Sequence, residues 1–247
     1  MKILGIIPAR YASTRFPGKP LALIGGKTMI RRVYDQALQC RDLDYVVVAT
    51  DDPRIEQEVA SFGGNVMMTS PDHKSGTERC GEAAIRLKGR GAGVVINIQG
   101  DEPFIHPEQI SQLAGLFRRK EVMIGTLVKQ VKSEGILFDP NVVKVIFDKN
   151  GRALCFSRQA LPYCRGIEQT EWLKAGKFYK HIGLYGYRTE VLKQITELPV
   201  SGLEKAESLE QLRWIENGYP VHVAETERES VAIDTPADLL KITNIPG

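Results

Sequence analysis

A loop near the start of the chain brings three cations together. They are Arg10, Arg15 and Lys19, with Ser13 among them, and the loop follows a short apolar run of strand length, 3–7. Arg and Lys supply the donors that a polyphosphate needs, and a glycine in the loop allows close backbone approach. Because open α/β sheets bind ligands at the carboxyl ends of their strands, this loop is well placed to bind an anion. The alternative is a basic loop that only faces solvent.

A second candidate site lies at the start of a predicted helix, 75–87. Ser75 is followed three residues later by a glutamate, which fits a capping box. Gly76, Thr77 and Arg79 complete the first turn. The N–H groups and hydroxyls there suit the polar edge of a ligand, yet a helix without any ligand begins in the same way. Both interpretations stay open on these residues alone.

Polar residues also follow a predicted buried strand at 94–98. Gln99 and Asp101 come directly after it. A carboxylate just past the end of a central strand lies on the same rim of the sheet as the basic loop. The alternative is an acidic turn that only closes the strand.

The composition argues against several classes of protein. The chain has 247 residues, 43% of them apolar and 26% charged, so it can form one large α/β domain with a sizeable core. Its net charge is only +3 and the basic residues are dispersed, so no nucleic-acid partner is expected. No apolar run approaches the roughly 20 residues that span a bilayer, so no membrane partner is expected either.

The cysteines and histidines show no metal-ligand spacing. The four cysteines are scattered without any C-x-x-C pair, which argues against a zinc site and against a disulfide-stapled secreted fold. The first apolar run is too short for a secretory signal. We therefore expect reduced thiols and a cytoplasmic protein.

The order of residues in the basic loop resembles a known family. The pattern P-A-R-x-x-S-x-R-x-P-x-K, at 8–19, resembles the opening of the CMP-sugar synthetases. The fuller PARYASTRFPGKP is similar to their 3-deoxy-manno-octulosonate (Kdo) branch, which more usually has Leu in place of Phe16. Further motifs resemble that branch in order: DHKSGTER at 72–79, INIQGDEP at 96–103, PNVVKV at 140–145, HIGLYGY at 181–187, LEQLR at 209–213 and IDTP at 233–236.

The resemblance implies a cytidylyltransferase that converts CTP and Kdo to CMP-Kdo and pyrophosphate, for lipopolysaccharide synthesis. It implies that CTP is bound by Arg10, Ser13, Arg15, Lys19, Ser75, Gly76, Thr77, Arg79 and Gln99. Asp101 and Asp234 would hold Mg²⁺, which is typically bound by one or two carboxylates with phosphate oxygens and water. The catalytic residues would then be Arg10, Lys19, Asp101 and Asp234.

The resemblance also implies a sugar site. Arg158 would pair with the sugar carboxylate, and the hydroxyls would be contacted by Gln99, His181, Tyr185, Glu210 and Gln211. From the residues alone, His181 is better explained as a core or surface histidine, and Glu210 as part of a solvated helix face. A relative that activates a sialic acid or 8-amino-Kdo would share the CTP side. A non-catalytic nucleotide-binding module would keep the basic loop and lose the metal carboxylates.

The predicted elements place the CTP-side residues on one rim. Strands at 3–7, 45–49, 66–68 and 94–98 alternate with helices at 29–38, 55–62 and 75–87, which is typical of a parallel doubly wound sheet. Pro8 is expected to end the first strand. Later elements are a helix at 107–117, a strand at 123–128, a hairpin of 142–148 and 153–157, a strand at 180–187, a helix at 203–214 and a strand at 230–233. Thr235 and Pro236 would start a final helix.

The expected architecture is thus an α/β, Rossmann-like nucleotidyltransferase fold. Its mixed, mostly parallel sheet would be flanked by helices in a single domain over 1–247. By the resemblance, an inserted dimerisation and sugar-binding subregion at 154–219 would make the protein a homodimer.

Overall fold

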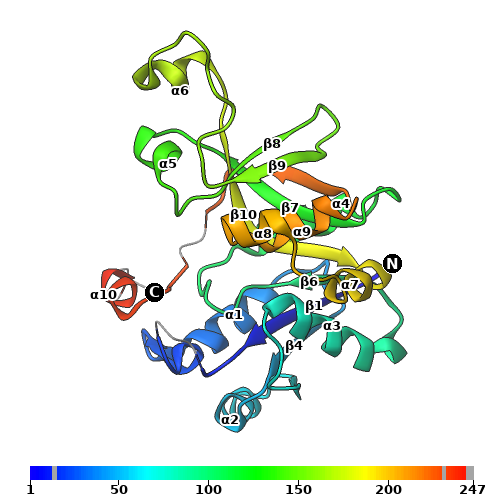
Figure 1. The fold of residues 1–247 in the computed structure, drawn as a ribbon. Helices are drawn as coiled ribbons and strands as arrows, with labels where there is room; N and C mark the ends of the chain where they lie inside the picture. Colours follow the sequence, from blue (N-terminus) through cyan, green and yellow to red (C-terminus); the bar gives the residue numbers. More distant parts are fainter. Residues whose placement is uncertain (13–15, 230–231, 243–247) are drawn as a thin grey trace.

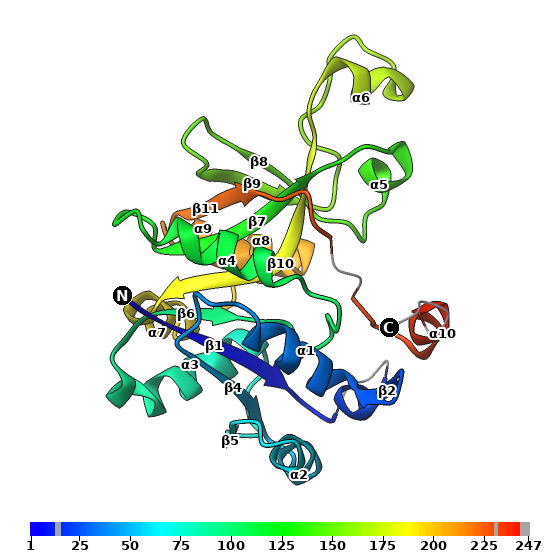
Figure 2. The same ribbon diagram turned by 180° about the vertical axis from the view of Figure 1, so that it is seen from behind.

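One mixed sheet forms the centre of the molecule. This computed structural model describes residues 1–12, 16–229 and 232–242, and its main sheet has the strand order β11-β7-β10-β6-β1-β4-β5 (Figures 1 and 2). The strands of this path are β1 (Lys2–Ala9), β4 (Tyr45–Thr50), β5 (Val66–Met68), β6 (Ala92–Asn97), β7 (Ile124–Gln130), β10 (Tyr179–Arg188) and β11 (Val221–Glu225). Strand β10 runs antiparallel to β6 and β7, whereas the other neighbours on the path are parallel. The predicted mixed, mostly parallel sheet is confirmed.

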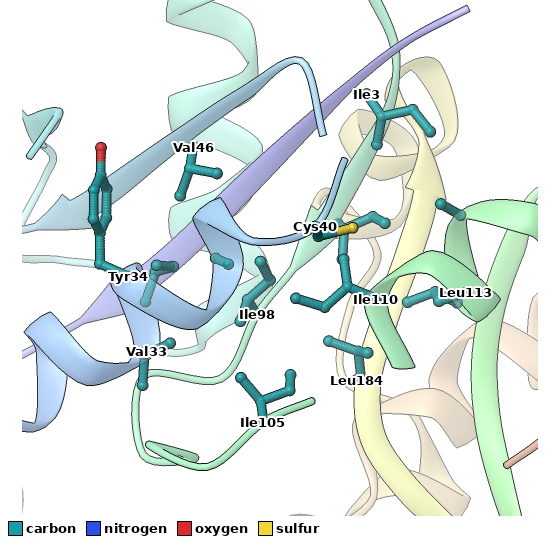
Figure 3. Close-up of a cluster of buried hydrophobic side chains, with 14 of the residues drawn as sticks. Ile3, Val33, Tyr34, Cys40, Val46, Ile98, Ile105, Ile110, Leu113 and Leu184 are labelled. Atoms are coloured by element: carbon teal, nitrogen blue, oxygen red, sulfur yellow. The ribbon is translucent and has the colours of Figure 1, made fainter. Parts of the chain in front are cut away.

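Helices cover one face of the sheet through their apolar stripes. They are α1 (Met29–Leu38), α2 (Pro53–Ser61) and α4 (Pro107–Leu116). Figure 3 shows Val33 of α1, Leu113 of α4 and Leu184 of β10 in the buried cluster between these layers. Removing such side chains from water is the main stabilising term for this layer.

The opposite face is covered by α3 (Gly76–Arg86), α7 (Thr189–Thr196) and α9 (Glu210–Glu216), as Figure 1 shows. Leu192 and Trp214 belong to the buried cluster on this side. The result is the predicted sheet flanked by helices. None of the described helices is long and apolar enough to cross a membrane.

Shorter elements complete the chain. Strands β2 (Leu23–Ile24) and β3 (Lys27–Thr28) form a hairpin, and β8 (Lys144–Phe147) pairs with β9 (Ala153–Ser157) in the predicted second hairpin. The remaining helices are α5 (Glu134–Phe138), α6 (Trp172–Ala175), α8 (Gly202–Glu207) and α10 (Pro236–Ile242), with 3-10 turns at Lys19–Leu21, Lys88–Arg90 and Gln169–Glu171. Around α5 and α6 the chain projects beyond the main sheet (Figure 1).

The helix starts predicted at Ser75 and Thr235 are confirmed by their caps, and Asp52 caps a third helix. The Ser75 hydroxyl accepts the N–H of Glu78 at 3.2 Å at the start of α3. Asp52 caps α2 by accepting the N–H of Arg54 at 2.9 Å. The Thr235 hydroxyl accepts the N–H of Asp238 at the start of α10. These caps satisfy N–H groups that a helix start otherwise leaves without partners.

The prediction that Pro8 ends the first strand is wrong. Strand β1 continues to Ala9, and Pro8 pairs with Ala49 of β4. The Ile6 carbonyl accepts the N–H of Ile98, on the β6 side of the strand. Residues two apart in a strand direct their N–H and C=O groups to the same side, so the position of the missing N–H of Pro8 also faces β6. Strand β6 ends at Asn97, before this position, so no hydrogen bond of the sheet is lost.

The predicted helix at 203–214 is broken. Ser208 lies between α8 and α9 with a positive φ of 53°, a left-handed conformation that no α-helix continues through. The spacing of Leu203, Ala206, Leu209 and Leu212 predicts one core stripe along this helix. Leu203 and Ala206 are exposed and only Leu209 and Leu212 are buried, so the prediction is wrong in its first half.

The last strand was predicted in the wrong place. Strand β11, at Val221–Glu225, was missed. Of the predicted strand at 230–233, the first two residues lie outside the described residues, and Ala232 and Ile233 are not in a strand. The predicted subregion at 154–219 is partly continuous with the main sheet, because it includes β10.

Candidate active site

A cavity of about 230 Å³ opens at the carboxyl ends of β1 and β6. Eight of the residues predicted to bind CTP or metal line it: Arg10, Lys19, Ser75, Gly76, Arg79, Gln99, Asp101 and Asp234. They come from four separate parts of the chain, and the parallel strands bring three of these parts to one rim. Two further predicted residues, Ser13 and Arg15, lie outside the described residues.

Lys19 joins the two predicted metal carboxylates. Its ammonium group donates to Asp101 Oδ2 at 2.7 Å and to Asp234 Oδ1 at 3.3 Å. Gly18 precedes it with a φ of 72°, a conformation that favours glycine, and donates its N–H to the Tyr11 carbonyl at 2.9 Å. This turn directs Lys19 back toward the sheet.

The loop after β6 approaches the end of β1 closely. A Cβ atom on Gly100 would lie 2.9 Å from the Pro8 carbonyl oxygen, which is too close for any side chain. Glycine at this position therefore allows Asp101, the next residue, to lie beside the basic loop. In this loop the glycine is thus required by the close approach of Pro8, and the aspartate supplies a carboxylate to the cavity.

A partly buried carboxylate fixes the start of α3. Glu210, the first residue of α9, accepts hydrogen bonds from the Ser75 hydroxyl at 3.2 Å and the Thr77 hydroxyl at 2.7 Å. Burial raises the pKa of Glu210, against the opposing effect of the hydroxyls and of Arg213. Thr77 is itself buried and is not among the residues that line the cavity. Glu210 therefore fixes the helix start.

Arg79 is buried at the wall of the cavity. Its guanidinium donates to Asp51 Oδ2 at 2.8 Å and to the Thr69 hydroxyl at 2.6 Å. These two partners hold its orientation and compensate its burial. The sequence interpretation missed Asp51, although its position directly after the strand at 45–50 places it on the same rim.

A second cavity, of about 240 Å³, lies between β10 and the start of β8. His181 lines it, and its Nε2 lies 3.0 Å from the Thr126 hydroxyl. Burial lowers the pKa of His181 to about 3, so the imidazole is neutral. Lys180 and Glu229 form an ion pair at the same cavity, and the sequence interpretation named neither residue.

The other predicted sugar residues do not meet at this cavity. Arg158 donates through its guanidinium to the carbonyls of Glu207 and Pro140, at 2.7 and 3.0 Å. Tyr185 is buried with its ring edge-to-face with a neighbouring Trp, and Gln211 is buried in α9. Their assignment to the sugar stays a prediction.

Asp101 and Asp234 suit a divalent cation that also binds phosphate oxygens. Among the residues that the structure describes, no group of three or more His, Cys, Asp or Glu side chains could hold a metal. These two carboxylates nevertheless converge on one ammonium group, so the space between them already accommodates a positive charge. Because Mg²⁺ takes water and substrate phosphates as further ligands, two carboxylates are a sufficient protein contribution. The donor set fits Mg²⁺ bound together with a nucleoside triphosphate.

Comparisons with known proteins identify the class. The family model described as cytidylyltransferase matches residues 4–229. The chain belongs to this cytidylyltransferase family. The matched range includes Lys19 and Asp101 and ends before Asp234.

Individual relatives cover nearly the whole chain. The 3-deoxy-manno-octulosonate cytidylyltransferase of Parabacteroides distasonis is 58% identical over 245 residues, which are 98% of this chain and 96% of the relative. The protein of the same name from Cytophaga hutchinsonii is 54% identical, over 99% of this chain and 97% of its own length. A solved structure of CMP:2-keto-3-deoxy-manno-octonic acid synthetase complexed with CTP matches with a TM-score of 0.90 and 41% identity, covering 98% of this chain and 97% of that one. The resemblance inferred from the motifs is confirmed.

Proposed function

We propose that this protein transfers the CMP group of CTP to Kdo and releases pyrophosphate, as a step in lipopolysaccharide synthesis. The full-length relatives bear the name of this activity, and the related structure at 41% identity contains CTP. The observation that carries the proposal is the meeting of Lys19 with Asp101 and Asp234 at the rim of the first cavity. Cations and paired carboxylates at one point suit the transfer of a phosphoryl-type group.

In this reaction the anomeric hydroxyl of the sugar loses its proton to water, and its oxygen forms a bond to the α-phosphorus of CTP. The bond from that phosphorus to the pyrophosphate oxygen breaks, and negative charge moves onto the leaving group. Arg10 and Lys19 line the cavity and stabilise this charge. Catalysis then rests mainly on positioning and on charge stabilisation, as in other phosphoryl transfers.

The nucleoside end of CTP would lie against α3. Ser75 and Gly76 present the helix start to the first cavity, and Arg79 forms part of its wall. Because Arg79 is held by Asp51 and the helix start by Glu210, these groups need little rearrangement when a ligand binds.

Asp101 and Asp234 would hold Mg²⁺ together with the phosphates. When bound, this ion neutralises phosphate charge and lowers the pKa of the attacking hydroxyl. The chain contributes the two carboxylates and sets the distance between them.

We further propose that Arg158 pairs with the Kdo carboxylate and that the hydroxyls are contacted by Gln99, His181, Tyr185, Glu210 and Gln211. Arg158 donates two of its five guanidinium N–H groups to carbonyls, so N–H groups remain for a carboxylate. The neutral His181 can exchange hydrogen bonds with a hydroxyl without carrying charge.

The protein would act as a homodimer in the cytoplasm, with residues 154–219 supplying much of the dimer interface. Large apolar side chains are exposed in this range, including Leu154 at 56% and Tyr163 at 72%. A partner chain that covers these side chains would remove their apolar surface from water.

Pyrophosphate release from CTP tests the function. The assay offers Kdo, N-acetylneuraminate or 8-amino-Kdo, each with Mg²⁺ and with EDTA. We expect turnover with Kdo and Mg²⁺ only. A preference for another acid sugar would keep the mechanism and change the substrate. CTP binding without release from any of the three sugars would refute the enzyme assignment and favour a nucleotide-binding module.

A further inference from the structure

A small apolar cluster lies beside the first cavity, apart from the two large clusters on the faces of the sheet. Its buried members are Ile24, Met29 and Ile233, and Phe16, Phe104 and Leu239 pack against them. We call these six residues the rim cluster. It lies where α10 comes beside the β2–β3 hairpin, an approach visible in Figures 1 and 2.

Three members of the rim cluster each lie close in sequence to one charged residue of the cavity. Phe16 lies three residues before Lys19, and Phe104 lies three residues after Asp101. Ile233 directly precedes Asp234. One apolar cluster therefore joins the three chain segments that carry the three charges.

Ile233 makes the tightest of these connections. Its side chain is fully buried, and its N–H donates to the Asp101 carbonyl at 2.9 Å. On the other side of Asp234, the N–H of Thr235 donates to the Asp238 carboxylate at 3.0 Å, within the cap of α10. The backbone is thus held on both sides of Asp234.

The ion pair of Asp234 with Lys19 is longer than that of Asp101. The Asp234 side chain is 42% exposed, and its oxygen lies 3.3 Å from Lys19, compared with 2.7 Å for Asp101. A partly exposed ion pair of this length contributes little free energy, so the backbone anchor at Ile233 adds to what the Lys19 contact supplies.

We propose that Ile233 is a positioning residue, which holds the Asp234 carboxylate beside Asp101 by anchoring its backbone in the rim cluster. The inference rests on the proposed role of these two carboxylates in binding a divalent ion. Groups that orient metal ligands without touching the metal commonly change its affinity 10- to 100-fold when they are removed.

Metal affinity is the first test. Mn²⁺ binding is measured by electron paramagnetic resonance in the presence of α,β-methylene CTP, which does not turn over. We expect Ile233→Ala to weaken Mn²⁺ binding about tenfold. Ile233→Val, which keeps most of the buried side chain, should weaken Mn²⁺ binding much less. Ile24→Ala is the matched control, because it removes a buried side chain from the same cluster without a charged neighbour in sequence, and it should bind Mn²⁺ as the wild type does.

A double-mutant cycle on kcat is the second test, and it needs no measurement of metal affinity. If Ile233 acts through Asp234, Ile233→Ala lowers kcat in the wild-type background and has little further effect on Asp234→Asn. A purely structural role would lower kcat equally in both backgrounds. Thermal melts establish first that each variant is folded.

The outcomes separate this proposal from the proposed function. If the wild-type protein binds no Mn²⁺ in the presence of the analogue, the proposed metal site is refuted, and the double-mutant cycle then decides whether Ile233 acts through Asp234. If the protein shows no turnover, the proposed reaction is refuted, and the Mn²⁺ affinities of the variants then decide whether Ile233 positions Asp234. Equal Mn²⁺ affinity of the alanine variant and the wild type, or an equal loss in Ile24→Ala, overturns the proposal. If Ile233→Ala does not fold, Ile233→Val compared with Ile24→Val replaces it, and an equal effect of the two is again the contrary result.

Discussion

At the scale of single residues, Glu210 shows how a partly buried carboxylate acts on the cavity through other residues. It contacts Ser75 and Thr77, of which Ser75 lines the cavity. The motif resemblance assigned it to the sugar, and the periodicity of the stretch suggested a solvated helix face. The structure instead places its carboxylate under α3, where two hydroxyls and Arg213 stabilise its charge. A direct contact with the sugar stays a prediction.

His181 gives a prediction about pH. Burial lowers its pKa to about 3, so the folded protein keeps this imidazole neutral at pH values where the unfolded chain binds a proton. The free energy of unfolding should therefore fall as the pH drops below about 6.5, the pKa of an unperturbed histidine. Between pH 7.5 and 5.5 the share of His181 is about 1 kcal/mol.

Urea denaturation of the wild type and of His181→Gln at the two pH values measures this share as a difference between the proteins. Nuclear magnetic resonance provides a direct check, because the ring signal that is lost in His181→Gln should not titrate between pH 5 and 8. A titration midpoint near 6.5 for that signal would contradict the prediction.

At the scale of elements, the break at Ser208 lets two carboxylates contact different elements, a strand and a helix. In a continuous helix, residues three apart share a face, so Glu207 and Glu210 would point the same way. The break allows Glu207 to accept from Ser157 of β9 at 2.6 Å while Glu210 reaches the start of α3. The left-handed conformation of Ser208 thus lets this segment contact both the β8–β9 hairpin and the wall of the first cavity.

Ser208 therefore gives a stability prediction. A non-glycine residue in the left-handed conformation costs roughly 1–2 kcal/mol, which glycine avoids, although glycine also has more freedom in the unfolded chain. We expect Ser208→Gly to raise the free energy of unfolding by about 0.5 kcal/mol. Ala206→Gly, at an exposed position of α8, should lower it by about 1 kcal/mol. Chemical denaturation measures both variants, and destabilisation by Ser208→Gly would contradict the argument.

Elements with a complete local signal could be predicted from the sequence. The helix at 29–38 and the strand at 66–68 have the predicted bounds, since apolar spacing and flanking turns agree there. Strand β11 was missed because it is a five-residue edge strand and its second residue, His222, is polar yet buried. The break at Ser208 was missed because serine at this position carries no signal for a positive φ.

At the scale of the whole molecule, the two halves of the candidate site differ in how far sequence predicts them. The CTP-side residues each follow a predicted strand or start a predicted helix, so the strand-end rule brings Lys19 and Asp101 together. The contacts of Arg158 and Tyr185 depend on tertiary packing. Sequence periodicity does not indicate that Arg158 donates to a neighbouring carbonyl or that Tyr185 is buried in the core. The placement of Asp234 likewise depends on packing at the rim cluster.

Because the cavity joins segments from both ends of the chain, ligands should stabilise the whole fold. A ligand at about 100 times its Kd adds roughly 2.7 kcal/mol to the free energy of unfolding, which raises Tm by about 5–10 °C for a domain of this size. We expect CTP with Mg²⁺ to reach this range and CTP with EDTA to give a smaller shift. Asp234→Asn should lose the part of the Tm increase that depends on Mg²⁺ and keep the part that CTP gives without Mg²⁺. Scanning calorimetry measures these shifts, with ATP and Mg²⁺ as the nucleotide control. Equal shifts with Mg²⁺ and EDTA in the wild type would show that CTP binds without a metal at Asp101 and Asp234.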